Sequence, residues 1–405
     1  HVQGKQRGEG ALAMRPTFAE AQPLRDNVSQ LPVIYAIDLG GSNFRVVRAQ
    51  LKEDGADDLQ RVKFALPEEA KLGSGHELFL AIARSLKSAI VSFGDEADSV
   101  DSKICVAMAF SFPMKHNSIS SAVLTRWTKG FAARGVEGQD VASLLQHAID
   151  EVGIQAKVVA LINDTVAAFL AARRSDHRCC LGCVFGTGTN GAYLEKSKDM
   201  VIDINWGDFG SDLESVSLLP CTEVDLELDG ESPNPGEMRF SKLVGGRFIG
   251  EITGRIVQKL IPELSQVNVR DKFTAALMAE IESMGSDKQK VSALLLSELG
   301  IQLNEARAET VTQVCTMVAT RAAKLGAAAI AAVLQHVWQE GNPTSMVSVG
   351  VEGSVVKEYN AFRTTLEETL KALLGKEQSK AVRLVDVEDG PPTGAAFAAA
   401  QALDS

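Results

Sequence analysis

The chain has 405 residues, of which 45% are hydrophobic and 23% are charged, and its formal net charge is −11. This length and apolar content suit a globular protein of about two or three domains. The negative charge argues against nucleic acid or an anionic membrane surface as the main partner. Six cysteines are too few for a disulfide framework in a chain of this length, so we expect reduced thiols and an intracellular protein.

The sequence predicts no membrane span, because no apolar run reaches the roughly 18 residues that a spanning helix needs. The Ala-rich stretch at residues 322–337 contains Lys324 and falls short. The first residue is His1 rather than Met, so a targeting signal cannot be read from this sequence. We expect a cytoplasmic location, with an organelle as the alternative.

The N-terminal 30 residues are expected to contribute little regular structure. Residues 1–10 are polar and contain glycine, which is typical of a disordered tail. Residues 11–30 are expected to form a short helix and a linker, because Pro16 and Pro23 interrupt any longer helix.

Residues 33–50 read as two strands joined by a tight glycine turn. The turn has the sequence Asp38-Leu39-Gly40-Gly41-Ser42-Asn43. Two glycines beside Ser and Asn expose backbone N–H groups and short polar side chains, which are the donors that a phosphate needs. Asp38, at the end of the incoming strand, is placed to hold a hydrated Mg²⁺ near that phosphate. An ordinary hairpin is the alternative.

The segments that follow alternate between strand and helix. Ser74 and Glu77 have the spacing of a capping box, and apolar residues then recur at helical spacing. Asp140 is expected to cap a second helix. The expected strands of this half, after the first hairpin, are residues 61–66, 103–112 and 158–162.

The same order of elements then begins again. Residues 179–185, 191–195 and 200–205 read as strands, and the turn between the first two has the sequence Gly186-Thr187-Gly188-Thr189-Asn190. The chain therefore predicts two α/β halves, each opening with a phosphate-sized glycine hairpin. Two such hairpins that face one another across a cleft can grip a nucleotide triphosphate from both sides.

The rest of the second half predicts helices with a few strands. Residues 213–236 are acidic and rich in turn residues, and we interpret them as a loop excursion. Residues 311–337 are apolar nearly all round a helical circumference, which indicates a buried helix. The remaining expected elements are a helix at 239–260, strands at 346–351 and 382–385 (the latter an inner strand), a helix carrying Phe362, Leu366, Leu370 and Leu373, and a final helix at 394–403.

Two motifs are set aside on their context. Gly186, Gly188 and Gly191 match the dinucleotide fingerprint, but the chain continues as a strand where that fold needs a helix, so we expect no dehydrogenase. Cys179, Cys180 and Cys183 lie within a strand, and no Cys or His pair follows at zinc spacing. Core thiols are the better interpretation.

Polar residues at strand ends are the candidates for chemistry. Asp164 lies where an apolar strand meets a helix. It is either the N-cap of that helix or a general base at the carboxyl edge of a sheet, where α/β proteins bind ligands. Lys129, taken alone, is expected to be a solvated charge, and Trp127 a core or rim aromatic.

Seven motifs along the chain are specific enough to compare with a known family. They are IDLGGSNFR at 37–45, FSFP at 110–113, RWTKGF at 126–131, NDT at 163–165, GTGTN at 186–190, NPG at 234–236 and VGVEGS at 349–354. These motifs occur together in the order that is found in hexokinases, so the chain resembles that family from about residue 11 onward.

The resemblance implies an α/β protein with the two-domain actin-like ATPase (ribonuclease H-like) fold and a cleft between a small and a large domain. The implied small domain comprises residues 31–162 and 394–405, and the large domain residues 11–30 and 163–393. The implied activity is ATP-dependent phosphorylation of a hexose at its 6-hydroxyl, with glucose as the expected hexose. ATP and Mg²⁺ are the implied cofactors.

The same resemblance implies roles for individual residues. Asp164 would take the proton from the 6-hydroxyl, and Thr128 and Lys129 would orient that hydroxyl, with Lys129 also near the transferred phosphoryl group. Asp38 would hold the Mg²⁺ shell. The other implied sugar ligands are Ser111, Asn163 and Asn190. The implied MgATP ligands are Asp38, Gly40, Gly41, Ser42, Asn43 and Arg45 in the first loop, Gly186, Thr187 and Gly188 in the second, and Gly353 and Ser354 beside the adenosine.

Two positions depart from the family pattern. Asn205 and Ser241 stand where hexokinases carry sugar-binding glutamates, and we place both among the expected sugar ligands. A hydrogen bond to a charged partner contributes about 1.5–3 kcal/mol, so losing two weakens binding by powers of ten unless other groups compensate. Asp203 and Asp208 are near in sequence, and strand alternation puts Asp203 on the same face as Asn205.

Two functional classes follow from this pattern. The first is a working hexose kinase, which the intact Asp164 and phosphate loops favour. The second is a catalytically weakened or inactive hexokinase-like protein that serves as a sensor or as a subunit of a larger assembly, which the two missing carboxylates favour.

Overall fold

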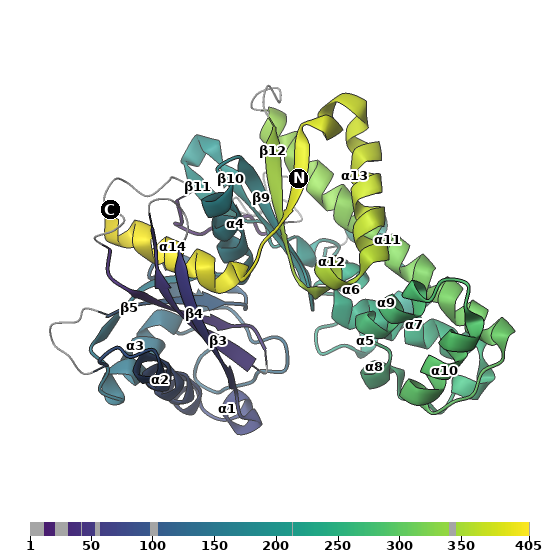
Figure 1. Cartoon of the computed structure of the whole chain (residues 1–405), viewed down its shortest axis with the longest axis horizontal. Helices are drawn as coiled ribbons and strands as arrows, with labels where there is room; N and C mark the ends of the chain where they lie inside the picture. The colour runs from purple at the N-terminus through teal and green to yellow at the C-terminus, as the bar shows by residue number, and fades with distance from the viewer. Residues whose placement is uncertain are drawn as a thin grey trace.

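The structure is a computed structural model that describes residues 12–20, 31–41, 43–52, 57–97, 104–212, 214–339 and 346–404. It has two lobes, and each lobe is built on one large sheet (Figure 1). Two long helices, α4 (Asp164–Ser175) and α14 (Gly390–Asp404), lie between the two sheets and pack against each other.

The first lobe contains a sheet with the strand order β4-β3-β2-β5-β8. Strand β2 pairs antiparallel with β3 and parallel with β5, and β5 pairs parallel with β8. These strands are β2 (Ile34–Leu39), β3 (Asn43–Gln50), β4 (Asp58–Ala65), β5 (Ile104–Phe110) and β8 (Ala156–Ile162). The lobe also contains α1 (Glu68–Leu72), α2 (Gly75–Ser92), α3 (Val141–Glu151) and the hairpin of β6 (Met114–Ser118) and β7 (Ser121–Leu124).

The second lobe repeats this topology. Its sheet has the order β1-β11-β10-β9-β12-β13, so β9 pairs antiparallel with β10 and parallel with β12, as β2 does with β3 and β5. The strands are β1 (Arg15–Pro16), β9 (Cys179–Phe185), β10 (Thr189–Glu195), β11 (Met200–Asp203), β12 (Val347–Glu352) and β13 (Val382–Asp386). The predicted repeat of two α/β halves is therefore confirmed.

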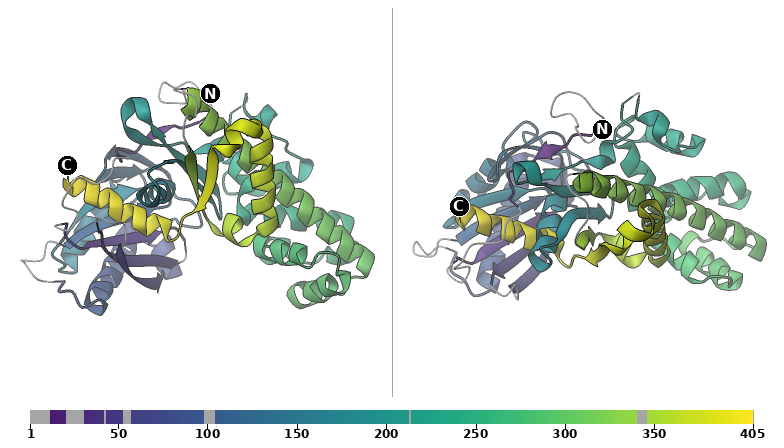
Figure 2. Two further views of the ribbon diagram at one scale, coloured as in Figure 1. Left: turned by 45° about the horizontal axis from the view of Figure 1, so that its top comes forward. Right: turned by 90° about the horizontal axis from the view of Figure 1, so that it is seen from above.

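Helix α4 packs on the second sheet and α14 packs on the first, which gives the order sheet, helix, helix, sheet across the molecule (Figures 1 and 2). Glycines allow these close approaches. A Cβ on Gly394 would lie 1.8 Å from the carbonyl oxygen of Ala167, and one on Gly182 would lie 2.6 Å from the Cα of Phe169. Helix α4 is thus held tightly between α14 and strand β9.

Further helices cover the outer face of the second sheet and extend away from it as an arm (Figure 2). They are α5 (Glu223–Glu231), α6 (Arg239–Val244), α7 (Gly246–Leu260), α8 (Val269–Lys272), α9 (Ala275–Ser283), α10 (Lys288–Leu299), α11 (Glu305–Gln339), α12 (Ser354–Glu358) and α13 (Asn360–Lys380). Their apolar faces form one core with that side of the sheet.

The local predictions hold in most places. Ser74 and Glu77 form the capping box of α2, and the Asp140 side chain caps α3. Strand β10 continues after Gly191, which confirms the reason for rejecting a dinucleotide fold. The cysteines at 179, 180 and 183 are buried free thiols, as predicted.

Several boundaries differ from the predictions. Within residues 12–20 the chain forms the short strand β1 and no helix. The expected excursion at 213–236 contains helix α5. Strand β13 is an edge strand, and not an inner one. In α13 the predicted residues Phe362, Leu366 and Leu370 are buried, but the next buried residue is Leu374, and Leu373 is 48% exposed.

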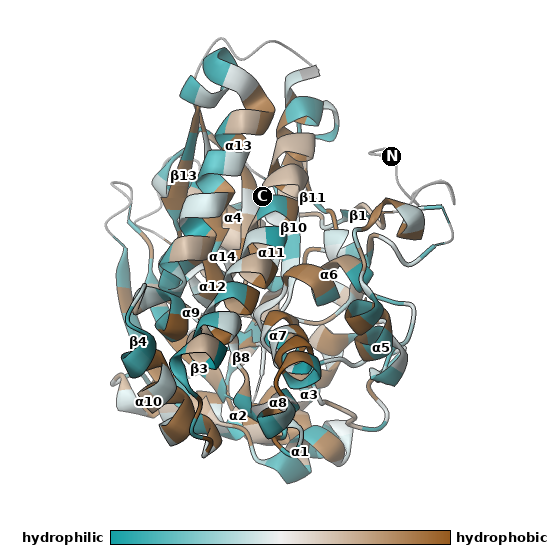
Figure 3. Ribbon diagram, turned by 90° about the vertical axis from the view of Figure 1, so that its right-hand side faces the viewer, coloured by the Kyte–Doolittle hydropathy of each residue, from teal (hydrophilic) through white to brown (hydrophobic). Residues whose placement is uncertain are grey.

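The sequence predicted that the helix at 311–337 is buried, but α11 is exposed on part of its circumference. Its residues include both hydrophilic and hydrophobic ones (Figure 3), and Met317 is 63% exposed. In the part of the chain that the structure describes, one helix is long and apolar enough to cross a membrane, and it is α11, over Glu305–Trp338. More than half of its most apolar stretch is buried inside the protein, so this is weak evidence for a span.

The tight contact of α4 with α14 gives a prediction for stability. Gly394→Ala should lower the free energy of unfolding by about 1–3 kcal/mol or more, because the new methyl group overlaps the Ala167 carbonyl. Urea denaturation measures this change. The control is Gly230→Ala in α5, where a Cβ meets nothing within 4 Å and the unfolding free energy should rise by roughly 0.5–1 kcal/mol. Equal effects at the two positions would contradict this account of the helix pair.

Candidate active site

A cleft of about 290 Å³ lies between the two lobes. Gly40 of the first glycine turn lines it, as do Thr187 and Gly188 of the second, so the two hairpins do face one cleft. The other predicted site residues that line it are Asp38, Ser111, Thr128, Lys129, Asn163, Asp164, Asn190, Asn205, Ser241 and Gly353.

The other predicted residues that the structure describes are not among those that line the cleft. Arg45 is on β3 and contacts Asp38 from behind. Asn43 begins β3 and Ser354 begins α12, and both are exposed. Gly41 and Gly186 belong to the two turns, but they are not among the lining residues. Ser42 lies outside the described residues.

Asp164 is the first residue of α4, and its neighbour Asn163 is the N-cap. The N-cap interpretation of Asp164 is therefore wrong. The Thr165 N–H donates to Asn163 Oδ1 at 2.9 Å and to Asp164 Oδ1 at 2.8 Å. The other oxygen, Asp164 Oδ2, lies 3.9 Å from Lys129 Nζ. A carboxylate at this position is stabilised by the positive end of the helix dipole.

Lys129 is held by a strained loop above an aromatic cluster, so it is more than a solvated charge. Its φ is +57°, a conformation that non-glycine residues rarely adopt. Its Nζ lies 5.7 Å from the ring centroid of Phe112, within the range of a cation–π interaction. Trp127 and Phe131 pack edge-on against Phe112, at 4.8 and 4.9 Å between centroids. The cluster fixes the loop that presents the lysine to Asp164.

Asp38 is a second carboxylate close to Asp164, and it is buried beside a cation. Arg45 donates to Asp38 Oδ2 from Nε at 3.0 Å and from Nη2 at 2.6 Å. Burial raises the pKa of Asp38, Arg45 opposes this rise, and the charge of Asp164 adds to it. Arg45 also contacts Asp389, which Arg61 contacts in turn. Since both Arg45 bonds fall on Oδ2, Asp38 Oδ1 remains for a metal ion or its water.

The second glycine turn is packed against the start of α7. A Cβ on Gly245 would lie 2.6 Å from the Thr187 carbonyl oxygen, and Gly246 N donates to the Gly186 carbonyl at 2.8 Å. The predicted helix at 239–260 is therefore wrong as one element: it is broken at Gly245 into α6 and α7, because the loop occupies the space beside the break. Ser241 Oγ, fully buried on α6, accepts a bond from the Thr189 N–H at 3.3 Å.

The end of the cleft away from Asp38 carries two carboxylates that the sequence did not assign. Asp203 and Asp208 both line the cleft. Asn190 Nδ2 donates to Asp203 Oδ1 at 2.7 Å, and Asn205 Nδ2 donates to Asp208 Oδ2 at 2.5 Å. Asn205 has a φ of +56°, and asparagine tolerates this left-handed conformation better than most residues. Both predicted asparagines therefore position carboxylates at this end.

Two arginines at this end were also missed. Arg15, on β1, is the cross-strand partner of Asp203, and its Nη1 donates to the Met114 carbonyl in the other lobe at 3.4 Å. Arg126 Nη1 lies 2.5 Å from Glu237 Oε2, and its Nη2 lies 3.6 Å from Asp208 Oδ1. A two-residue strand leaves no periodic signal, so the sequence could not have placed Arg15 opposite Asp203.

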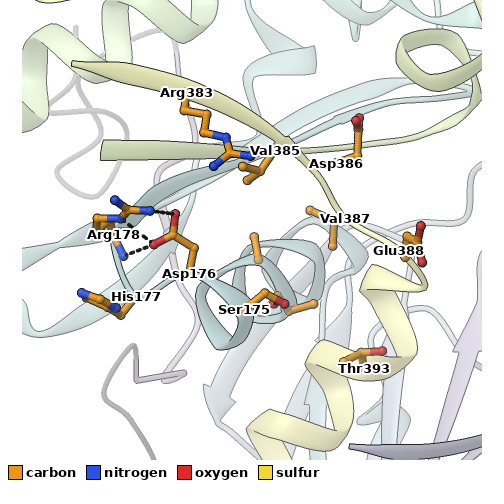
Figure 4. A pocket seen from close by; sticks show the side chains of 12 residues that line it. Ser175, Asp176, His177, Arg178, Arg383, Val385, Asp386, Val387, Glu388 and Thr393 are labelled. Atoms are coloured by element: carbon orange, nitrogen blue, oxygen red, sulfur yellow. Dashed lines mark hydrogen bonds and ion pairs between the residues drawn. The ribbon is translucent and has the colours of Figure 1, made fainter. Parts of the chain in front are cut away.

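A larger hollow of about 900 Å³ lies at the opposite end of α4 (Figure 4). Arg178 and Asp176 form an ion pair there, which lowers the pKa of Asp176 to about 2. None of the predicted site residues lines this hollow. The smaller cleft, where carboxylates, a lysine and two glycine turns converge, is therefore the candidate active site.

The donors in this cleft suit magnesium better than a transition metal. The described residues contain no group of three or more His, Cys, Asp or Glu side chains that could hold a metal ion alone. Magnesium is usually bound by one or two carboxylates together with waters and substrate phosphates. Asp38, with one free oxygen beside the first glycine turn, fits that pattern.

Comparisons with known proteins point in one direction. Two family models, both described as hexokinase, match residues 2–174 and 180–401. Hexokinase-2 of Oryza sativa subsp. japonica is 35% identical over 97% of this chain and 84% of its own length, and Hexokinase-7 of the same plant is 34% identical over 97% and 89%. The solved structure of the hexokinase from Schistosoma mansoni complexed with glucose is 30% identical, with a TM-score of 0.86 over 99% of this chain and 91% of that one.

The Asp38–Arg45 contact gives a prediction for the unliganded protein. Arg45→Met should lower the free energy of unfolding at pH 7 by about 1–3 kcal/mol, because a buried carboxylate loses its charged partner. Without Arg45 the folded-state pKa of Asp38 rises further above its unfolded value of 3.8. The deficit should therefore shrink as the pH falls toward the unfolded pKa, because Asp38 is protonated in both states below that value.

Urea denaturation between pH 4 and pH 7 measures this deficit. The matched control is Arg61→Met, which removes the more exposed partner of Asp389 and should change the unfolding free energy by no more than about 1 kcal/mol. A deficit for Arg45→Met that stays constant with pH would contradict the assignment to Asp38.

Proposed function

Because the chain belongs to the hexokinase family, we propose that it transfers the γ-phosphoryl group of MgATP to the 6-hydroxyl of a hexose, with glucose as the first candidate. One observation carries this proposal. Asp164 Oδ2 lies 3.9 Å from Lys129 Nζ, in a cleft that both glycine turns line. A general base, a cation and two donor-rich loops are the groups that phosphoryl transfer requires.

In this proposal Asp164 accepts the proton of the 6-hydroxyl. Its Oδ1 is held by Thr165, so Oδ2 is the oxygen that is free to act. Lys129 lies beside the attacking oxygen and offsets negative charge on the incoming phosphoryl group. Thr128 orients the 6-hydroxyl, and Ser111 and Asn163 bind other hydroxyl groups of the sugar. The aromatic cluster under Lys129 keeps the ammonium group in place before substrate arrives.

The nucleotide is proposed to bind between the two glycine turns. Gly40 of one lobe and Thr187 and Gly188 of the other line the cleft, and their backbone N–H groups would donate to the phosphates. Gly353 has a φ of +110° and lies against the second turn, where a Cβ would meet the Phe185 carbonyl oxygen at 2.4 Å. Because Gly353 has no side chain, we propose that the adenosine lies against its backbone, next to Ser354 at the start of α12.

A divalent cation, when bound, would neutralise charge on the phosphates of the nucleotide. Asp38 would hold it through Oδ1 while Arg45 keeps Oδ2. Since Arg45 is itself tied to Asp389 just before α14, the position of this carboxylate depends on the same helix pair that joins the lobes.

The test is a coupled assay with MgATP and a panel of hexoses, comparing the wild type with Asp164→Asn. The variant should lose about 10²–10⁴-fold in kcat, the usual contribution of a general base, while MgATP binding by calorimetry stays unchanged. The control is Asp150→Asn, an exposed carboxylate on α3 of the first lobe, which should retain wild-type kcat.

The sensor or subunit alternative gives a different result in the same assay. If no hexose shows turnover above that of Asp164→Asn, while the wild type still binds sugar and nucleotide, the kinase proposal fails. The absence of family glutamates at Asn205 and Ser241 is the observation behind this second candidate.

A further inference from the structure

The end of the cleft beyond Asp164 is rich in charged groups that the proposed mechanism does not use. Asp38, Asp164 and Asp203 all line the cleft. Burial raises the pKa of Asp38 and of Asp203, and the nearby charge of Asp164 adds to the rise in each. Asp208 lines the same end as Asp203. The negative charges of Asp203 and Asp208 disfavour a phosphate at this end of the cleft, whereas a ligand that donates hydrogen bonds can pair with them.

We propose that Asp203 and Asp208 bind the hexose, each accepting hydrogen bonds from hydroxyl groups remote from the one that is phosphorylated. The inference rests on the proposed function and adds to it two sugar ligands outside the family's motif positions. Asn205 and Ser241 then act differently from what the sequence implied: Asn205 positions Asp208, and Ser241 supports the second glycine turn.

The contacts around Asp203 leave it able to accept from a ligand. It is 6% exposed, and Asn190 Nδ2 holds its Oδ1 at 2.7 Å. The Asn205 backbone N–H also donates to Asp203. A carboxylate offers about four lone-pair sites, so these two donors do not saturate it. Arg15, directly across the strand pair, supplies the opposite charge without an ion pair that would block the oxygens.

Asp208 is arranged in a parallel way. Asn205 Nδ2 holds Oδ2, and Oδ1 faces Arg126 Nη2 across 3.6 Å, which is longer than a hydrogen bond. The Asp208 side chain is 27% exposed. The shorter contact of Arg126 is with Glu237, at 2.5 Å between Arg126 Nη1 and Glu237 Oε2. The Asp208 carboxylate therefore keeps acceptor capacity toward the cleft.

The arginines connect this end to both lobes. Arg15 reaches from β1 to the Met114 carbonyl of the first lobe, and Arg126 reaches from the first lobe to Asp208 and Glu237 of the second. A sugar that binds Asp203 and Asp208 would therefore contact two carboxylates whose neighbouring arginines each connect one lobe to the other. This places sugar recognition at the junction of the lobes, next to Asp164.

The experiment measures binding of D-glucose to the full chain without nucleotide, by calorimetry. Asp203→Asn and Asp208→Asn should each weaken glucose binding by about 10- to 100-fold, the effect of removing a charged acceptor, and should leave MgATP binding unchanged. The control is Glu237→Gln, which removes the closest partner of Arg126 but not a cleft-lining group, and should change glucose binding less than about 3-fold.

Deoxy sugars make the test specific. The wild type should bind 2-, 3- or 4-deoxy-D-glucose more weakly than glucose wherever the missing hydroxyl contacts Asp203 or Asp208. In the variant that lacks that carboxylate, the corresponding penalty should disappear. If circular dichroism shows that Asp203→Asn does not fold, the test is made with Asp208→Asn alone. Asp208 is partly exposed, so its substitution should not disturb folding.

Binding and turnover separate this inference from the proposed function. Glucose binding that depends on the two carboxylates, in a protein without turnover, would support the inference and contradict the kinase. Unchanged glucose affinity in both variants, deoxy-sugar penalties that persist in them, or no glucose binding by the wild type would overturn the inference.

Discussion

The close packing of α4 is the constraint on which the rest of the molecule depends. Gly394 lets α14 approach from one sheet, and Gly182 lets β9 approach from the other, each at a distance that a side chain would prevent. Helix α4 cannot shift without disturbing both lobes, because it packs on one sheet and on the helix that covers the other. Its first residue is Asp164, so the tight packing of α4 also fixes the position of the proposed base.

The cleft shows a consistent arrangement of charge around that residue. Asp38 has Arg45, Asp164 has Lys129 and Asp203 has Arg15 as the nearby cation. In each case the cation leaves at least one carboxylate oxygen without a short ion pair. Neighbouring carboxylates repel one another, and burial raises the pKa of Asp38 and Asp203. A metal ion at one end and hydroxyl donors at the other are the ligands that relieve this repulsion.

Much of the fold could be predicted from the sequence, because its signals are local. Strand alternation, the capping box at Ser74 and the two glycine turns each specify one element, and the repeat of the pattern specifies the second half. The break of the long helix at Gly245 could not be predicted, since its cause is a loop about 60 residues away in the chain that packs against it. Strand β1 was missed for the same reason: two residues form a strand only because β11 lies beside them.

The site was predictable where motifs are contiguous and unpredictable where lobes meet. Asp164, Lys129 and the glycine turns were found because each lies in a recognisable stretch, and the structure brings them to one cleft. The roles of Asn190 and Asn205 were not visible, because an amide that binds a carboxylate looks the same in sequence as one that binds a sugar. Asp203 and Asp208 acquire meaning only from Arg15 and Arg126, which approach from distant parts of the chain.

A crystal structure of the chain with D-glucose and a non-hydrolysable ATP analogue would show directly whether one cleft holds both substrates around Asp164. We expect the 6-hydroxyl within hydrogen-bond distance of Asp164 Oδ2, the γ-phosphate between the two glycine turns, and remote hydroxyls on Asp203 and Asp208. A sugar bound away from Asp164, or a nucleotide that contacts neither turn, would contradict this expectation.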